Sequence, residues 1–307
     1  MCDLSNSIFH DKAKARKHLE AIRWADGRFC PHCGEAEHTS YVRGRKHRPG
    51  LYCCNGCKKQ FTVTVGTLFE RSKVPLNKWM LAYHLMCASK KGISAHQLHR
   101  MLGVTYKTAW FMAHRIRESM RDLDPGTVGG SNKVVEADET YIGGKAKNRA
   151  FRKPPSKEAV FSLVERNNQV RSFHVANVNS KTLRPIMVKH ADRKSYLMTD
   201  EASVYVNVGR EYQGHGTVNH SANEYVRGGF WHTNTVENYF SILKRGITGV
   251  YQHVSQKHLS RYLCEFDFRY NERAGHGISD TERANKALKG IEGKRLTYRR
   301  PVNWAHV

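Results

Sequence analysis

Two C-x-x-C pairs constrain the start of this chain more tightly than any other feature. Cys30 and Cys33 form the first pair, and Cys54 and Cys57 form the second after an intervening β-rich stretch. Each C-x-x-C turn places two thiolates on one edge of a tetrahedron, so two turns complete a Cys₄ zinc site. Cys53 does not keep the two-residue spacer to Cys57, so we expect it to be a neighbouring strand residue. A ribbon this small buries little core, and one structural Zn²⁺ should supply its folding energy.

The charge of the chain points to a polyanion partner. Its formal net charge is +24, from 51 Lys and Arg against 27 Asp and Glu. Such an excess, spread over folded segments, favours binding to nucleic acid. Basic residues also gather around the cysteine pairs, where we expect phosphate contacts, with solvated loop charges as the alternative. These residues are Arg43, Arg45, Lys46, Arg48, Lys58 and Lys59.

The sequence contains no signal for a membrane or for secretion. No run of 18 apolar residues predicts a membrane span, and the N-terminal stretch lacks the apolar region of a signal peptide. Eight cysteines without a secretory signal favour a cytoplasmic location and metal binding rather than disulfides. The histidines that could replace a cysteine ligand, although nothing requires it, are His32, His38 and His47.

A helix-turn-helix pattern follows the cysteine pairs. Residues 93–120 predict two helices joined at Gly103, with Ser94 and Thr105 as their N-caps. In a helix-turn-helix the N-terminal end of the second helix meets the base edges of DNA. The residues expected to contact DNA there are Tyr106, Lys107 and Thr108. The alternative is an ordinary helical hairpin acting as a spacer.

Two predicted strands in the C-terminal part carry carboxylates. Residues 196–200 form a short apolar run that ends at Asp200, which is typical of a buried strand. Residues 133–144 alternate and end in two glycines, which predicts a strand with Asp138 near its middle or end. Glu136 lies on the same side of that strand, where it could tune a site or be solvated.

A third carboxylate lies on a predicted helix. Val236, Phe240 and Leu243 fall on one apolar face of residues 232–246, and Glu237 and Lys244 share an adjacent stripe. Two or three acidic side chains brought together can hold a pair of Mg²⁺ ions. The competing interpretation is local, because Asn234-x-x-Glu237 has the spacing of a helix capping box.

The acids and their surroundings closely resemble a known family. The stretches DETYIGGK, MTDEASVY and NTVENYFSILKRG are similar to those of the DDE transposases of zinc-ribbon insertion sequences, bacterial relatives of the Merlin elements with an ISXO2-like transposase domain. The resemblance covers nearly the whole chain, including the zinc ribbon. It implies an α+β multidomain protein whose catalytic domain is ribonuclease-H-like, with a central mixed sheet flanked by helices.

The resemblance also implies roles for particular residues. Asp138, Asp200 and Glu237 would hold two catalytic Mg²⁺ or Mn²⁺ ions, with Lys244 near the scissile phosphate and His232 as another candidate. The resemblance leaves an asparagine as the alternative third ligand, which here would be Asn234 or Asn238. The chain would then bind the terminal inverted repeats of an element, cleave double-stranded DNA and join the ends to a target. It would act as a homodimer or higher oligomer associated with the bacterial nucleoid.

The turn-rich stretch 122–132 marks the main expected domain boundary. We expect an N-terminal helix and zinc ribbon in residues 1–75, a helix-turn-helix region in 76–124, the catalytic domain in 125–285 and a basic tail in 286–307. Two other functions compete. A DNA-binding regulator with an inert C-terminal domain would not need the three acids, and another ribonuclease-H-like nuclease, such as a resolvase, would share them but lack the end-binding module.

Overall fold

The computed structural model of the chain describes residues 4–44, 46–143, 157–218 and 230–297. They fall into two compact units. The first runs to Asp122 and also includes the segment that begins at Arg273, and the second runs from Leu123 to Glu272. Within the described ranges no helix is long and apolar enough to cross a membrane.

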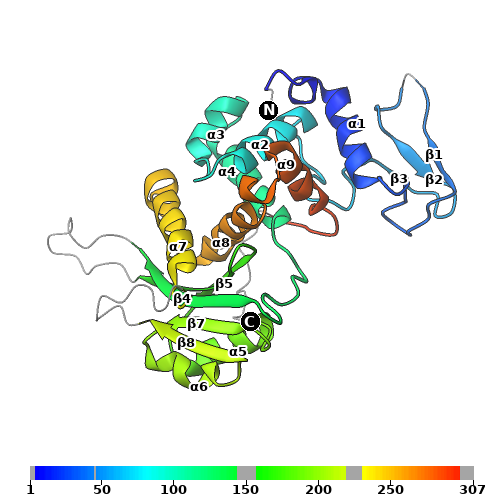
Figure 1. Cartoon of the computed structure of the whole chain (residues 1–307). Coiled ribbons are helices and arrows are strands. Elements are labelled where there is room, and N and C mark those ends of the chain that lie inside the picture. The colour runs from blue at the N-terminus through cyan, green and yellow to red at the C-terminus, as the bar shows by residue number, and fades with distance from the viewer. Residues whose placement is uncertain (1–3, 45, 144–156, 219–229, 298–307) are drawn as a thin grey trace. The chain divides into compact units, whose positions relative to one another are not determined.

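The first unit begins with a capped helix and a small ribbon (Figure 1). Helix α1, Lys12–Arg23, starts at Asp11, whose carboxylate accepts hydrogen bonds from the backbone N–H groups of Ala13 and Lys14. The ribbon is an antiparallel sheet in the order β1-β2-β3, with bounds Thr39–Tyr41, Tyr52–Cys54 and Gln60–Phe61. Its core contains only a few side chains, Tyr52 and Phe61 among them, beside the cysteines.

The expected helix pair of the first unit is confirmed. Helix α3, Ala95–Leu102, and helix α4, Tyr106–Ser119, are joined by a turn in which Gly103 has φ 58°, a left-handed conformation that suits glycine. Ser94 and Thr105 cap the two helices by accepting from the N–H groups of their third residues. Both pack on helix α2, Leu76–Ala88, which is buried nearly all round.

The C-terminal segment differs from the expected division of the chain. Helix α9, Asp280–Lys289, packs on α2 in the first unit, where Arg283 donates to the carbonyl of Cys87 at 2.9 Å. Backbone hydrogen bonds then tie Ile291 to Leu68 and Gly293 to Gly66. Residues 273–297 are therefore part of the N-terminal unit, not the end of a catalytic domain followed by a loose tail. The alternation rules used on the sequence cannot detect such long-range docking.

The second unit is built on a five-stranded mixed sheet in the order β6-β5-β4-β7-β8. Strands β6, β5 and β4 are antiparallel, whereas β4, β7 and β8 run parallel. The bounds are Val134–Ile142 for β4, Glu158–Glu165 for β5, Val170–Val175 for β6, Tyr196–Asp200 for β7 and Gly214–Val218 for β8. Residues 160–165 and 170–175 are two alternating runs in the sequence, which predicts a hairpin, and β5 and β6 confirm it.

Helices cover both faces of this sheet, as the sequence resemblance implied (Figure 1). Apolar side chains of α7 and α8 build one core with β5 and β6, and α5 and α6 contribute to a second core with Val135, Ala137 and Leu197. The bounds are Ser180–His190 for α5, Val206–Gly209 for α6, Asn234–Gly246 for α7 and Gln256–Asn271 for α8. Two apolar faces explain why the central strands are buried on both sides.

Strand β8 was not expected, because residues 207–233 are rich in His and Gly and their sequence predicts an irregular segment. Its residues Gly214-His-Gly-Thr-Val lack an apolar run, so local pattern gives no strand signal. A close approach explains one glycine, since a Cβ at Gly216 would lie 1.7 Å from the ring of Trp231. The pairing of β8 with β7 depends on this tertiary packing and not on strand propensity.

Candidate active site and metal-binding residues

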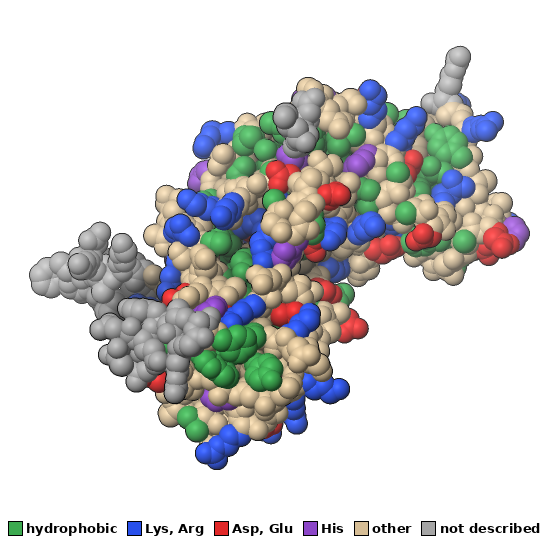
Figure 2. Space-filling view, viewed as in Figure 1, with side chains coloured by type: hydrophobic (Ala, Val, Ile, Leu, Met, Phe, Trp, Pro, Cys, Tyr) green, Lys and Arg blue, Asp and Glu red, His purple; other side chains and the backbone are tan. Residues whose placement is uncertain are grey.

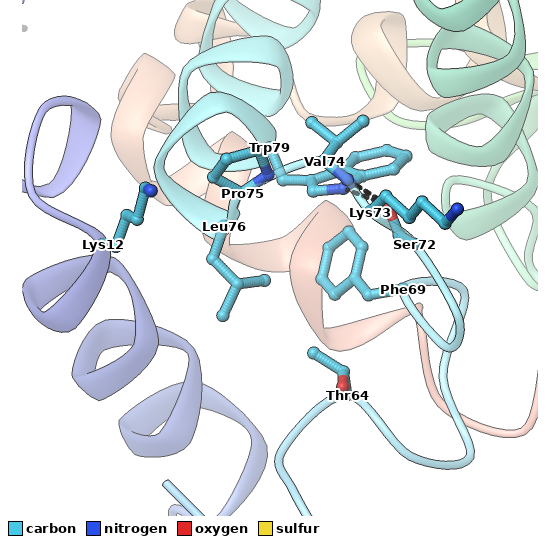
Figure 3. A pocket seen from close by; sticks show the side chains of 9 residues that line it. All are labelled: Lys12, Thr64, Phe69, Ser72, Lys73, Val74, Pro75, Leu76 and Trp79. Carbon is cyan, nitrogen blue, oxygen red and sulfur yellow. Dashed lines mark hydrogen bonds between the residues drawn. The ribbon is translucent and has the colours of Figure 1, made fainter. Parts of the chain in front are cut away.

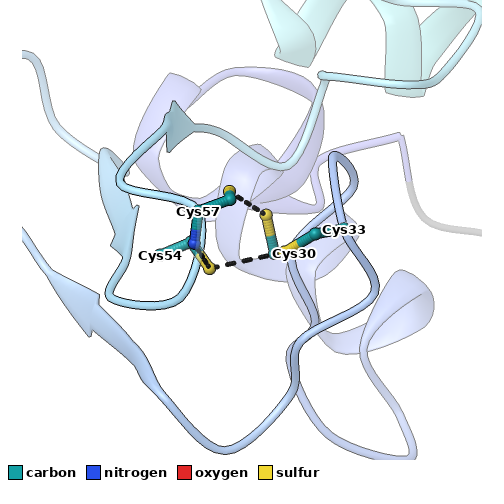
Figure 4. Close-up of side chains that lie close together, drawn as sticks. All are labelled: Cys30, Cys33, Cys54 and Cys57. Carbon is teal, nitrogen blue, oxygen red and sulfur yellow. Dashed lines mark hydrogen bonds between the residues drawn. The ribbon is translucent and has the colours of Figure 1, made fainter.

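The four cysteines predicted to bind zinc come together at one point of the ribbon (Figure 4). All four Sγ atoms lie within 4.8 Å of one another. The sulfur of Cys30 is 3.7 Å from that of Cys57, and the sulfur of Cys33 is 3.6 Å from that of Cys54. Tetrahedral zinc with Zn–S bonds of about 2.3 Å needs sulfurs about 3.8 Å apart, so the donor set fits Zn²⁺.

The structure also decides between the adjacent cysteines. Cys54 points into the cluster, where its sulfur accepts from the backbone N–H of Cys57 at 3.5 Å, and this contact lowers the pKa of the Cys54 thiol to about 7. Cys53 lies outside the cluster, on strand β2 opposite Ser40 and Gln60. The two-residue spacer identified the correct cysteine.

The basic residues of the ribbon are exposed. Arg43, Lys46, Arg48, Lys58 and Lys59 all lie at the surface, and none has an ion pair with another residue that the structure describes. Arg45 falls outside the described residues. Lys and Arg side chains are also frequent elsewhere on the face shown in Figure 2. These cations are available for phosphate, as the expected DNA contacts require.

The start of α4 presents two of its three expected DNA-contacting residues to solvent. Tyr106 and Lys107 are exposed, and the Tyr106 ring stacks on His96 with ring centroids 4.3 Å apart. Thr108 is half-buried, and its hydroxyl lies 2.9 Å from that of the capping Thr105. The stacked rings give this end of the helix a fixed, flat surface.

A hollow of about 320 Å³ opens at the start of α2 (Figure 3). Lys12 and Lys73 line it, beside the rings of Phe69 and Trp79. The indole N–H of Trp79 donates to Ser72 at 3.1 Å, which fixes the ring in the wall. No acid or cysteine lines this hollow, so it offers no metal site.

Asp138 and Asp200 lie on neighbouring parallel strands and on the same face of the sheet. Glu136 of β4 pairs with Met198 of β7, and each aspartate follows two residues later on its strand. Side chains alternate between the two faces of a strand, and Val135 and Leu197 belong to the core on the side of α5 and α6. The two aspartates therefore lie on the other face, which α7 covers. The resemblance to the transposase family implies that two of the three carboxylates lie on neighbouring strands, and the strand pairing agrees with this expectation.

The acids influence one another electrostatically. Burial, together with the negative charges of Glu139, Asp200 and Glu237, raises the pKa of Asp138 to about 7. A hydrogen bond from the backbone N–H of Glu139, at 2.7 Å, opposes this rise. A half-buried carboxylate whose pKa is raised by neighbouring acids is a favourable position for a cation.

Glu237 lies in the first turn of α7, exposed to solvent. Its Oε1 accepts a hydrogen bond from the hydroxyl of Thr233 at 3.1 Å. Asn234 is the first helical residue and not the N-cap, so the capping box suggested by the spacing Asn234-x-x-Glu237 is not formed. Helix capping therefore does not account for a glutamate at this position.

The cap is supplied from another element by Glu136, which the sequence left without a definite role. Its carboxylate accepts from the backbone N–H groups of Thr235 and Val236 at 2.8 and 2.9 Å. These are two of the orphan donors at the start of α7. The same carboxylate lies 2.6 Å from Nε of Arg166 and 3.3 Å from Nδ1 of His232. No local pattern reveals this contact, which joins residues about 100 positions apart.

A second polar contact fixes α7 further along its length. The hydroxyl of Tyr239 donates to Asp267 of α8 at 2.5 Å, and Ser172 of β6 donates to the same carboxylate from its backbone and its hydroxyl. Ser172 also contacts Ser162, which pairs with Asp138 across β4 and β5. The helix that carries Glu237 is thus held to the sheet at two points.

The acids are more widely spaced than the cysteines. Apart from the zinc cluster, no set of three His, Cys, Asp or Glu ligand atoms in the described ranges lies within 4.8 Å of one another. This spacing does not argue against a pair of cations. Paired metal ions lie about 3.5–4 Å apart, so their outer ligands are further from each other than the ligands of a single ion.

The remaining candidates lie around Glu237. Asn234 and Asn238 are exposed in the same helical turns, and Lys244 is exposed in the last turn of α7. Seven residues separate Lys244 from Glu237, which is about 10 Å along a helix. His232 turns its Nδ1 toward Glu136 and so belongs to the contact that caps the helix.

Comparison with known proteins identifies the family. Residues 129–271 match the family described as "ISXO2-like transposase domain", and residues 10–60 match "Transposase zinc-ribbon domain". The chain is also 30% identical over 291 residues to the "Uncharacterized protein in transposable element ISH50" of Halobacterium salinarum, with 85% of this chain and 91% of that protein covered. The chain belongs to the ISXO2-like transposase family. Its N-terminal unit contains the zinc ribbon of these transposases, and its C-terminal unit is their ribonuclease-H-like domain.

Proposed function

We propose that this member of the ISXO2-like transposase family cleaves DNA at the ends of its own element and joins those ends to target DNA. Asp138, Asp200 and Glu237 are the proposed catalytic acids. One observation carries the proposal: two aspartates at equivalent positions of parallel strands share a sheet face with a glutamate in the first turn of the covering helix. All three are close enough for Asp200 and Glu237 to raise the pKa of Asp138.

The proposed role of these side chains is to hold divalent cations and the DNA backbone. Bound Mg²⁺ or Mn²⁺ would activate the attacking oxygen and stabilise the leaving oxygen in an in-line displacement at phosphorus. Asp138 is half-buried, and the charges of both Asp200 and Glu237 raise its pKa, so it is the proposed central ligand. Lys244 is the proposed phosphate contact from the same helix as Glu237.

The N-terminal unit is the proposed end-binding module. The exposed cations of the ribbon would contact phosphates, and Tyr106 and Lys107 at the start of α4 would face base edges. Thr108 would contribute from the same turn. Binding as a dimer or higher oligomer would bring two ends of the element together.

The test is a cleavage and joining assay with the full chain. The substrate is a duplex that carries the inverted repeats flanking the gene, and a shuffled duplex is the control. We expect nicks that leave 3′-OH ends at the element boundary, joined products, and no reaction when the divalent ions are chelated. Specific binding without cleavage under any divalent ion would favour the regulator. Cleavage without end preference or joining would favour a nuclease of another kind.

A further inference from the structure

Glu136, which is not one of the three proposed catalytic acids, accepts four hydrogen bonds through its carboxylate. Its side chain is fully buried, with 0% exposed. Oε2 accepts from the backbone N–H groups of Thr235 and Val236. Oε1 accepts from the Thr235 hydroxyl at 2.8 Å and from Nε of Arg166 at 2.6 Å. A buried carboxylate is costly unless it is fully paired, and this one is.

Arg166 extends the contact to the segment before α7. Besides its bond to Glu136, its two terminal nitrogens donate to the carbonyls of Phe230 and His232, both at 2.8 Å. Its own backbone N–H donates to Val134 of β4 at 3.0 Å. One guanidinium therefore joins the end of β5, strand β4 and the entry to α7. The rigid, planar donor set of arginine suits this task, and lysine could not make all three contacts.

We call the contacts of Glu136 and Arg166 with the start of α7 the clamp. The clamp lies next to two of the proposed catalytic acids. Glu136 is two residues before Asp138 on the same face of β4, and Val236 is directly followed by Glu237. The clamp thus ties the strand that carries one acid to the helical turn that carries another. We infer that Glu136 and Arg166 are positioning residues that set the distance between Glu237 and Asp138 for cation binding. This inference rests on the proposed function.

Glu136→Gln is the sharpest variant, because it keeps the shape of the side chain. Every partner of the carboxylate is a donor, so an amide nitrogen must face a donor whichever way it is turned. Metal ligands whose supporting contacts are removed typically lose about 10–100-fold in metal affinity or activity. We expect a loss of this size in the cleavage rate at low Mg²⁺, with part of it recovered at high Mg²⁺. Affinity for end DNA should not change.

Glu165→Gln is the matched control. Glu165 is also buried, lies at the end of β5 next to Arg166, and pairs with Lys133 at 2.5 Å and with the backbone N–H of Gly129 at 2.9 Å. In the described part of the chain its carboxylate makes no hydrogen bond or ion pair with α7. Its variant should lose stability in a similar way while keeping the Mg²⁺ dependence of cleavage within about threefold of wild type.

Two measurements on the full chain decide the matter. The first is the Mg²⁺ concentration for half-maximal cleavage, and the second is hydrogen exchange at the amides of Thr235 and Val236, which needs no metal. Faster exchange together with a raised Mg²⁺ midpoint in Glu136→Gln, but not in Glu165→Gln, supports the inference. Faster exchange with an unchanged midpoint overturns it and leaves Glu136 as a helix cap alone.

A second variant tests the inference if the Glu136→Gln protein does not fold. Arg166→Lys keeps a positive charge beside Glu136 but loses contacts to the carbonyls, and it should show the same raised midpoint to a smaller degree. A wild-type midpoint in a folded Arg166→Lys protein would then overturn the inference. The proposed function is tested separately. Cleavage by Asp138→Asn protein would refute the catalytic site. An inactive Asp138→Asn protein together with a wild-type Mg²⁺ midpoint in Glu136→Gln would refute only the positioning role of Glu136 and Arg166.

Discussion

Asp138 and Asp200 lie beside each other on parallel strands because Glu136 pairs with Met198 and each aspartate follows two residues later. This relationship places two carboxylates of the same sign on one face of the sheet, where a bound proton, water or a cation can relieve their repulsion. Burial and the neighbouring acid charges together raise the pKa of Asp138 to about 7. If these carboxylates bind a cation, as the family's sequence pattern implies, the cation should relieve their repulsion and stabilise the fold.

The first prediction is that divalent cations stabilise the wild-type chain. A ligand that binds only the folded state adds about 1.4 kcal/mol at ten times its dissociation constant. Thermal unfolding with and without Mg²⁺ should show a higher midpoint with the ion, and Asp138→Asn should lose this response. An equal response in the variant would place the cation elsewhere.

The second prediction concerns zinc. We expect about one Zn²⁺ per full-length chain, lost in Cys54→Ser and kept in Cys53→Ser, because only Cys54 points its sulfur at the other three cysteines. Elemental analysis of the purified proteins measures it. Loss of zinc in Cys53→Ser alone would show that the register of the ribbon is wrong by one residue.

The third prediction is that the ribbon contacts phosphate. Replacing Lys58 and Lys59 together by alanine should weaken binding to end DNA and to random duplex alike. Each phosphate contact that is lost should reduce the slope of log affinity against log salt by about 0.9. Arg184→Ala is the control, because Arg184 is already paired with Glu211 at 2.6 Å. An unchanged slope in the lysine variant would exclude these residues from the interface.

The fourth prediction is a pH dependence at the second anchor of α7. Burial raises the pKa of Asp267 to about 6, so the folded state holds a proton that the unfolded chain releases near its ordinary value of 3.8. This contribution to stability is present below about pH 4 and is lost as the pH rises through 6. The unfolding temperature of Asp267→Asn minus that of the wild type should therefore increase between pH 4 and pH 7, because only the wild type loses this contribution. A constant difference between the two proteins would contradict the assignment.

Local signals in the sequence were sufficient for much of the fold. The cysteine spacing identified the four cysteines whose sulfurs come together in the structure, and the caps at Ser94 and Thr105 located the helix pair. Alternation found β4 and the hairpin of β5 and β6. These features depend on residues near each other in the chain, which is why pattern alone could find them.

What the sequence missed depends on contacts between distant segments. Strand β8 has too many glycines to show a strand pattern, and α9 joins the N-terminal unit through contacts such as Arg283 with Cys87. The sequence around Glu136 does not reveal its hydrogen bond with the backbone N–H of Val236, because the two residues are 100 positions apart. A capping-box spacing at Asn234 pointed instead to a local cap that the structure does not form.

The central claim is that Asp138, Asp200 and Glu237 act together in DNA cleavage. The most direct measurement is the single-turnover cleavage rate of an end-containing duplex by Asp138→Asn, Asp200→Asn and Glu237→Gln. The exposed neighbour Glu201, changed to Gln, is the control, and Asn234→Ala and Asn238→Ala test the other third ligand. The account predicts that each acid variant loses at least about 100-fold in rate while end binding and the Glu201→Gln rate stay near wild type. Wild-type cleavage by Glu237→Gln with an inactive asparagine variant would contradict the assignment of Glu237, and normal cleavage by all three acid variants would contradict the account as a whole.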